Sequence, residues 1–190
     1  MPKILAFAGS TRADSWNRKL IRVAADATRA VGAEVTLIEL ADYPLPLMNE
    51  DLEAREGLPD NAQRLKALFK SHDALLIASP EYNSSIPPLL KNAIDWVSRE
   101  WQGESGLMPY QNKVAAIMGA SPGSLGSMRM LPHLRQVLNA LGVHTLPGQF
   151  SLPNASEAFD ADNGMLKSPA RLHALLDDLV RTTRALRAGG

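Results

Sequence analysis

The chain has 190 residues, enough for one domain with a sizeable core, and its 45% apolar and 21% charged residues are typical of a globular protein. Its 20 basic and 20 acidic residues balance, so no net charge attracts it to nucleic acid or to an anionic membrane. The absence of cysteine excludes disulfides, thiolate nucleophiles, cysteine-ligated zinc and iron–sulfur clusters, and it suits a cytoplasmic protein.

Strand and helix signals alternate along the chain. Short apolar runs predict five strands, at residues 4–8, 35–40, 74–78, 114–118 and 143–146. Apolar residues at helical spacing predict helices over about 20–31, 61–70, 87–97, 125–141 and 169–186. This alternation favours an α/β fold with a doubly wound parallel sheet, and we expect residues 1–190 to form a single domain.

Individual residues predict several boundaries. Ser168 is expected to cap the last helix ahead of Pro169, which suits a first turn. Gly119 is expected to break the fourth strand. The segment 41–59, with its prolines and acidic residues, is expected to be a solvated loop.

Ligands of doubly wound sheets bind at the carboxyl ends of the strands, so the loops after strands one, three and four matter most. The first loop, residues 9–17, has donor side chains at Ser10, Thr11, Arg12, Ser15 and Asn17. Together with the loop amides and the following helix N-terminus, they are what a phosphate needs, although neither G-x-G-x-x-G nor a Walker motif is present. The alternative is a polar turn with a helix cap at Asp14 or Ser15. Trp16 either contacts a cofactor or covers the core.

The loop after the third predicted strand reads S-P-E-Y-N-S-S-I-P over residues 79–87. Tyr82, with the backbone around Pro80 and Asn83, could form a wall for a flat heteroaromatic ring and hydrogen bond to its edges. Glu81 is either a proton donor or a structural carboxylate. The alternative for the whole loop is a rigid turn, with Tyr82 half-buried, that leads into a proline-initiated helix.

Three motifs resemble the NADPH-dependent FMN reductase family, which includes bacterial quinone and chromate reductases. They are G-S-x-R-x-x-S-x-N at 9–17, P-E-Y-N-x-S-I-P at 80–87 and L-K-N-A-I-D-W at 90–96, and the similarity continues through 119–121, Gly126 and 133–135. The resemblance implies a flavodoxin-like sheet of strand order 2-1-3-4-5 with helices on both faces. It also implies bound FMN, with the phosphate in the first loop and the ring against the second and third.

The loop after the fourth strand, G-A-S-P-G at 119–123, formally matches the nucleophile elbow of α/β-hydrolases, and histidines lie downstream. An esterase is therefore one alternative. Pro122 counts against it, because the elbow needs a backbone N–H after the serine for its oxyanion hole. We expect Ser121 and Gly123 to border the FMN ring instead, since glycine lets a ligand approach closely.

The resemblance implies an NAD(P)H-dependent FMN oxidoreductase that passes electrons by a ping-pong mechanism to a quinone, free flavin, chromate, azo dye or metal complex. The flavin would carry the chemistry, so we expect no catalytic side chain and no metal site. NADPH and NADH are both open as co-substrates. A flavodoxin-type electron carrier is a second alternative, although carriers usually dock through charge and this chain is neutral.

We also expect a homodimer or homotetramer with the flavin near an interface, as pairing of subunits is implied by the resemblance. Two predicted helices carry more apolar residues than one stripe requires. These residues are Trp96, Val97, Trp101, Met130, Val137 and Leu141. The alternative is that they line the core.

Overall fold

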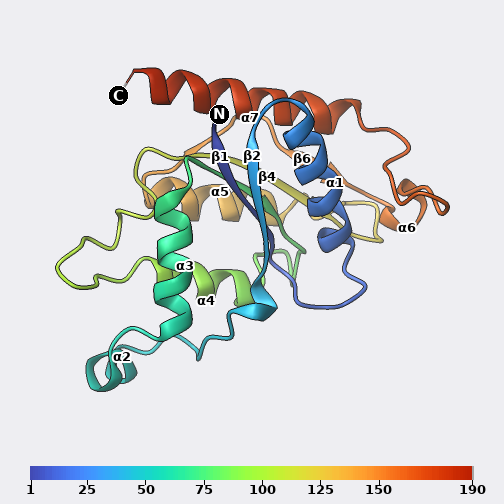
Figure 1. Ribbon diagram of the computed structural model, residues 1–190. Coiled ribbons are helices and arrows are strands. Elements are labelled where there is room, and N and C mark those ends of the chain that lie inside the picture. Colours follow the sequence, from blue (N-terminus) through green and yellow to red (C-terminus); the bar gives the residue numbers. More distant parts are fainter. Residues whose placement is uncertain (190) are drawn as a thin grey trace.

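A parallel sheet forms the centre of the structure, a computed structural model that describes residues 1–189 (Figure 1). Its strands are β1 (Lys3–Ala8), β2 (Glu34–Glu39), β3 (Ala74–Ala78), β4 (Val114–Ala120), β5 (His144–Thr145) and β6 (Phe150–Leu152). Their order is β2-β1-β3-β4-β5, with β6 also paired to β4. The predicted strand order and the parallel pairing are confirmed.

Two short strands fill the fifth position of the sheet, where one strand at 143–146 was predicted. β5 pairs with the start of β4, so that His144 lies opposite Val114, and β6 pairs with the end of β4. Pro147 falls between β5 and β6, and proline has no N–H with which to continue a ladder. The sequence analysis missed β6, because three residues are too few to show an alternating pattern.

β4 continues through Gly119 to Ala120, so the expected break at this glycine is wrong. A Cβ on Gly119 would lie 2.7 Å from the Ser127 Cβ and 2.8 Å from the Ser79 carbonyl oxygen. Both distances are too short for real contacts. Gly119 is therefore needed for close packing within the protein, and not to make room for a ligand.

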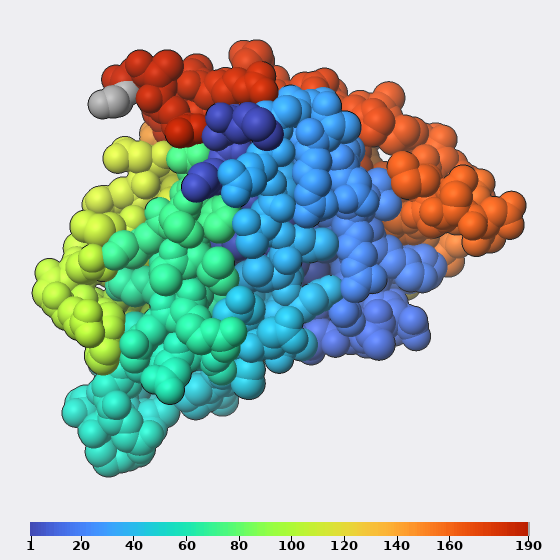
Figure 2. Space-filling view, viewed as in Figure 1, coloured from blue at the N-terminus to red at the C-terminus, as the bar shows by residue number. Residues whose placement is uncertain are grey.

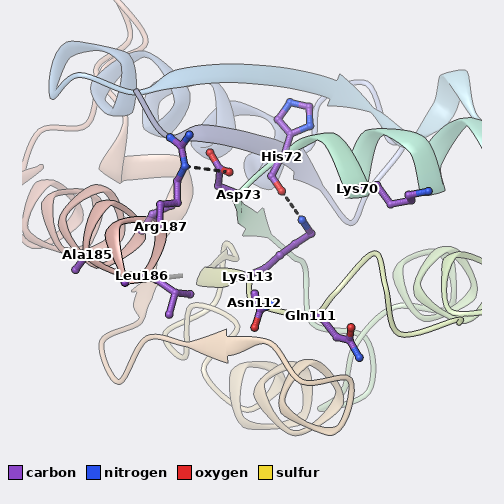
Figure 3. A pocket seen from close by; sticks show the side chains of 11 residues that line it. Lys70, His72, Asp73, Gln111, Asn112, Lys113, Ala185, Leu186 and Arg187 are labelled. Atoms are coloured by element: carbon purple, nitrogen blue, oxygen red, sulfur yellow. Dashed lines mark hydrogen bonds and ion pairs between the residues drawn. The ribbon is translucent and has the colours of Figure 1, made fainter. Parts of the chain in front are cut away.

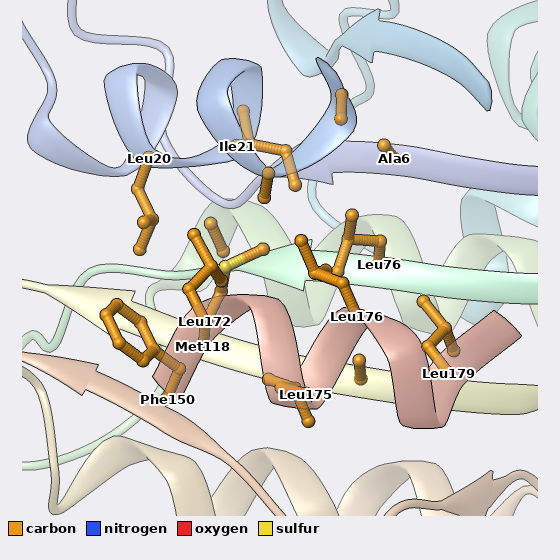
Figure 4. Close-up of a cluster of buried hydrophobic side chains, with 14 of the residues drawn as sticks. Ala6, Leu20, Ile21, Leu76, Met118, Phe150, Leu172, Leu175, Leu176 and Leu179 are labelled. Carbon is orange, nitrogen blue, oxygen red and sulfur yellow. The ribbon is translucent and has the colours of Figure 1, made fainter. Parts of the chain in front are cut away.

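Helices cover both faces of the sheet, as predicted. The first face carries α1 (Trp16–Ala30) and α7 (Ala170–Ala188), and the second carries α3 (Asp60–Ser71), α4 (Pro88–Val97) and α5 (Met130–Ala140). In Figure 4, the first face packs Leu20 of α1 and Leu172 and Leu176 of α7 around Met118 and Phe150 of the sheet. Strands buried on both faces explain why their sequences are continuously apolar.

The starts of α5 and α7 differ from the prediction. α5 begins at Met130 and not at 125, because Gly126 and Ser127 have φ angles of 56° and 67°, outside the helical region. Pro169 itself occupies the N-cap position of α7, so the expected Ser168 cap is wrong.

The acidic segment 41–59 is more ordered than the predicted loop. It contains the helix α2 (Glu50–Glu56), which stands out from the body of the molecule (Figure 2). Asn49 caps α2, since its side chain accepts from two first-turn amides. The Glu53 carboxylate then pairs with Arg99 at 2.8 Å. α2 itself contains no buried residue, so the segment is ordered by these bonds and by apolar residues that pack against Trp96, among them the buried Leu58.

The apolar residues expected at an interface belong to the core instead. Trp96, Val97 and Met130 are fully buried, and Trp101, Val137 and Leu141 are partly buried against core clusters. The segment 41–59 supplies a second contact for α4, since the Trp96 Nε1 donates to the Pro46 carbonyl oxygen at 2.8 Å. The interface argument from these residues is therefore wrong.

Two short segments, η1 (Leu40–Asp42) and α6 (Ala155–Ala158), complete the elements. Within residues 1–189, no helix is long and apolar enough to cross a bilayer.

Candidate functional site

The loops that follow β1, β3 and β4 leave the sheet as neighbours. Ala8 at the end of β1 lies opposite Ala78 of β3, which lies opposite Met118 of β4. The pairing runs one step further, since Gly9 N donates to the Ala78 carbonyl (2.8 Å) and Ser79 N donates to the Met118 carbonyl (2.9 Å). The structure thus brings the three predicted loops together at the carboxyl edge, where parallel sheets bind ligands.

The first loop presents unpaired backbone donors. The amides of residues 10–14 and 16–18 have no acceptor within residues 1–189, whereas Ser15 N donates to the Arg12 carbonyl at 3.1 Å. The exposed Arg12 guanidinium donates to the Asp14 carbonyl at 2.9 Å and has no acidic partner in the described part of the chain. Free amides at a helix N-terminus beside a guanidinium form a donor set for a phosphate.

The serine hydroxyls of this loop add to the donor set. Ser10 and Ser15 are largely buried, with 5% and 4% exposed. Ser15 occupies the N-cap position of α1, as the alternative held, but its side chain makes no cap hydrogen bond. Its hydroxyl is therefore available to a ligand.

Two other predicted contacts of this loop have internal partners. Asn17 is 2% exposed, its Nδ2 donates to the Ala120 carbonyl, and its Oδ1 accepts from Ala120 N, both at 2.9 Å. Its side chain therefore joins α1 to β4 and is not a free phosphate donor. The Trp16 ring stacks on the Phe159 ring with their centroids 5.7 Å apart, and the Lys19 ammonium lies 4.5 Å from the centroid of the Trp16 ring. The indole covers the core, as the alternative held, and Trp16 can serve a phosphate only through its backbone amide.

The second loop forms a tight turn from Tyr82 to Ser85. Tyr82 N donates to the Ser85 carbonyl and Ser85 N to the Tyr82 carbonyl, each at 3.0 Å. Asn83 and Ser84 between them have φ angles of 49° and 67°. Their amides have no acceptor among the residues described, and the Tyr82 side chain is 52% exposed. The turn can thus offer an aromatic surface and two amides, but not the Tyr82 amide. Pro80 precedes it, and its carbonyl accepts from the Ser79 hydroxyl at 3.0 Å.

Both ends of this turn are tied to α5. The Glu81 carboxylate accepts from Arg129 N at 2.9 Å, from Arg129 Nε at 2.7 Å and from Met130 N at 3.2 Å. Glu81 is therefore a structural carboxylate that caps α5, the second of the two roles considered. Ser85 Oγ is hydrogen bonded to His133 Nδ1 at 2.9 Å. The sequence analysis assigned no role to Arg129 or His133, although His133 lies in a stretch that carries the family resemblance.

The third loop is held by β6 and α6. Ser121 N donates to the Leu152 carbonyl (3.2 Å), the Ser121 carbonyl accepts from Ala155 N (3.0 Å), and the hydroxyl donates to the Gly123 carbonyl (3.3 Å). No histidine is bonded to Ser121 in residues 1–189, since His133 pairs with Ser85. Within the described residues, the serine of the G-A-S-P-G motif therefore lacks the histidine partner that the hydrolase alternative requires. Space does remain above Gly123, where an added Cβ would meet only the Ser121 hydroxyl at 3.8 Å.

A hollow of about 630 Å³ lies at the opposite, amino edge of the sheet (Figure 3). Its charged groups already have partners. The pairs are Lys70 with Glu104 at 2.6 Å, Asp73 with Arg187 at 3.4 Å, and the Lys113 ammonium with the His72 carbonyl. Burial lowers the pKa of Lys113 from 10.5 to about 8. Its paired polar lining makes this hollow a weaker candidate than the carboxyl edge. No group of acidic, histidine or cysteine residues within 1–189 could hold a metal.

Known proteins match this chain over most of its length. Residues 2–157 match the family model described as NADPH-dependent FMN reductase. An NAD(P)H-dependent FMN reductase of Pseudomonas aeruginosa is 41% identical over 171 residues, covering 89% of this chain and 87% of that protein. A quinone reductase of Pseudomonas putida is 32% identical over 182 residues, covering 95% and 94%. The solved structure of FerB, a flavoenzyme NAD(P)H:(acceptor) oxidoreductase from Paracoccus denitrificans, matches with a TM-score of 0.76 and 29% sequence identity. The match covers 99% of this chain and 98% of FerB.

Proposed function

The chain belongs to the NADPH-dependent FMN reductase family, and on that premise we propose that it is an NAD(P)H-dependent FMN oxidoreductase with a quinone-type acceptor. The observation that carries the proposal is the set of unpaired amides in residues 10–14 and 16–18, on the loop beside the one that contains the Tyr82–Ser85 turn. Buried polar groups in folded proteins almost always have a partner, and the largely buried Ser10 and Ser15 side chains beside these amides have none within residues 1–189.

We assign the FMN phosphate to the first loop. A phosphate monoester carries negative charge and several acceptor oxygens. The loop offers amides, the Ser10 and Ser15 hydroxyls, the Arg12 guanidinium and the N-terminal end of α1, all of which favour an anion. Asn17 supports this assignment indirectly, because its paired hydrogen bonds hold the first loop beside the third.

We assign the isoalloxazine ring to the second and third loops. Tyr82 offers exposed aromatic surface, Asn83 offers a free amide, and Gly123 leaves open space. When bound, FMN supplies the redox chemistry, taking a hydride from NADPH or NADH and passing electrons to the acceptor. The protein then needs to bind and orient three molecules, and no side chain has to act as a nucleophile. If one face of the bound ring stays open, the electron donor and the acceptor can use the same place in turn, which is a ping-pong mechanism.

The decisive experiment separates a reductase from an electron carrier. FMN-loaded protein is mixed anaerobically with NADPH or NADH, and the flavin absorbance is followed before and after a quinone is added. A reductase loses its yellow absorbance rapidly after it is mixed with NADPH or NADH, and it regains this absorbance when the quinone is added. Slow bleaching, with no turnover, would identify a flavodoxin-type carrier, and colourless protein that binds no FMN would refute the proposal.

We also propose that the protein is a homodimer or homotetramer. Exposed apolar residues other than those first expected lie near the candidate site: Tyr82, Leu125 and Met128 are 52%, 41% and 50% exposed. A second copy that covers them would form a closed two-fold contact. Light scattering at micromolar concentration tests this, and a monomer mass with FMN bound would contradict it.

A further inference from the structure

The Tyr82–Ser85 turn has a conformation that one of its central residues does not favour. Asn83 and Ser84 both have positive φ. Asparagine adopts this region readily, but at the position of Ser84 such turns usually have glycine, because a Cβ is crowded there. The turn is also an isolated bridge and does not extend into a sheet ladder. Contacts outside the turn must therefore hold it in place.

Those contacts come from one helix. Glu81, before the turn, is bonded to the first residues of α5, and Ser85, at its end, is bonded to His133 about one helical turn further along. The two ties differ in strength. The Glu81 side chain is only 7% exposed and accepts several charge-assisted hydrogen bonds, whereas Ser85 and His133 share a single bond near the surface.

His133 differs from the other histidines of the chain in what it holds. His72 is bonded to the Leu68 carbonyl and to Thr36, away from the carboxyl edge. His144 and His173 make no side-chain hydrogen bond within residues 1–189. His133 alone among the four histidines is thus connected to a loop of the candidate site.

We propose that His133 is a positioning residue for the cofactor ring. By holding the Ser85 hydroxyl, it keeps the turn in the one arrangement that places the unpaired amides of Asn83 and Ser84 at the ring edge. The inference rests on the proposed function, because it assigns these amides to bound FMN. His133 acts through Ser85 and does not itself contact the reacting atoms.

Three variants test the proposal. His133→Ala removes the tie, His133→Asn retains a polar atom close to the position of Nδ1, and His173→Ala is a matched control on an exposed helical position of α7. In the protein without FMN, we expect amide exchange of Tyr82 and Ser85, whose amides are bonded across the turn, to be about 3- to 10-fold faster in His133→Ala, as the loss of one hydrogen bond implies. His133→Asn should restore slow exchange, and His173→Ala should leave it unchanged.

Ligand binding provides the second measurement. We expect His133→Ala to weaken FMN and riboflavin binding by the same factor, about 3- to 10-fold, because the phosphate loop is untouched. The absorption spectrum of the bound flavin should also shift, and His133→Asn should reverse both changes. Parent-like exchange in His133→Ala would overturn the proposal, as would altered exchange with unchanged affinity and spectrum, or an Asn variant no better than Ala. A parent protein that binds no flavin would refute the proposed function, and with it the role of the turn toward the ring.

Discussion

The two edges of the sheet carry opposite kinds of polar chemistry. The amino edge has a hollow of about 630 Å³, but the charged groups that line it are already paired with other charged side chains or with backbone carbonyls (Figure 3). The carboxyl edge has amides without acceptors, an arginine without an acidic partner in residues 1–189 and a turn at positive φ. Since a satisfied group gains little from a ligand, unpaired donors mark a binding site better than volume does.

Asn17→Ala should give the largest effect, because it breaks the support of the carboxyl edge. The substitution leaves the Ala120 amide without its partner and removes one of the two hydrogen bonds to the Ala120 carbonyl, which keeps the Ser127 hydroxyl at 3.1 Å. We expect the free energy of unfolding to fall by about 3 kcal/mol, or the Tm by about 9 °C. Thermal unfolding measures it, with the exposed Asn139→Ala as the control. A Tm equal to that of the control would show that Asn17 is not structural.

Lys113→Met tests whether the amino edge is purely structural. Below pH 8 the buried ammonium is charged in the folded and the unfolded chain, and its burial costs about 3 kcal/mol. Between pH 8 and 10.5 the unfolded chain binds more protons, so the stability of the parent rises with pH. The variant should lack this rise.

Urea unfolding at several pH values across that window measures the difference between parent and variant, with the exposed Lys167→Met as the control. FMN affinity should not change in Lys113→Met. Parallel stability curves would contradict the lowered pKa of Lys113, and a loss of FMN affinity would move the ligand to the amino edge.

Arg12→Ala should weaken FMN binding by about 1.5–3 kcal/mol, as expected for the loss of one charge-assisted contact. Riboflavin, which lacks the phosphate, should bind the variant and the parent equally. The Tm without FMN should stay within experimental error, because Arg12 is exposed and has no ion pair within the described chain. Isothermal titration measures both ligands, and Arg181→Ala on α7 is the control. A large loss of stability with unchanged FMN affinity would make Arg12 structural.

Ser121→Ala should have the smallest effect. Its hydroxyl bonds only to a backbone carbonyl of its own loop, so NADPH oxidation with a quinone should stay within a few-fold of the parent. Steady-state kinetics decide the matter. Complete loss of turnover with flavin still bound would return a catalytic role to this serine.

Some site residues stay candidates for their predicted role and others have structural partners instead, and the two groups differ in how far along the chain their partners lie. Arg12 and Ser15 act through neighbours within a few residues, so a local motif describes them well. Glu81 and His133 depend on partners 48 positions away, across the second loop and α5. No spacing along the chain reveals such a pair.

The sequence by itself determined that strands and helices alternate, the order in which they follow one another along the chain, and the loops that hold the candidate site. Those features follow from local apolar periodicity and from short motifs, which are written in consecutive residues. Only the tertiary structure decided that Trp16 stacks on Phe159, that Met130 is core, and that Asn17 pairs with a residue 103 positions away. A polar or apolar residue is compatible with either role, and the choice is made by which distant group the folded chain brings within bonding distance.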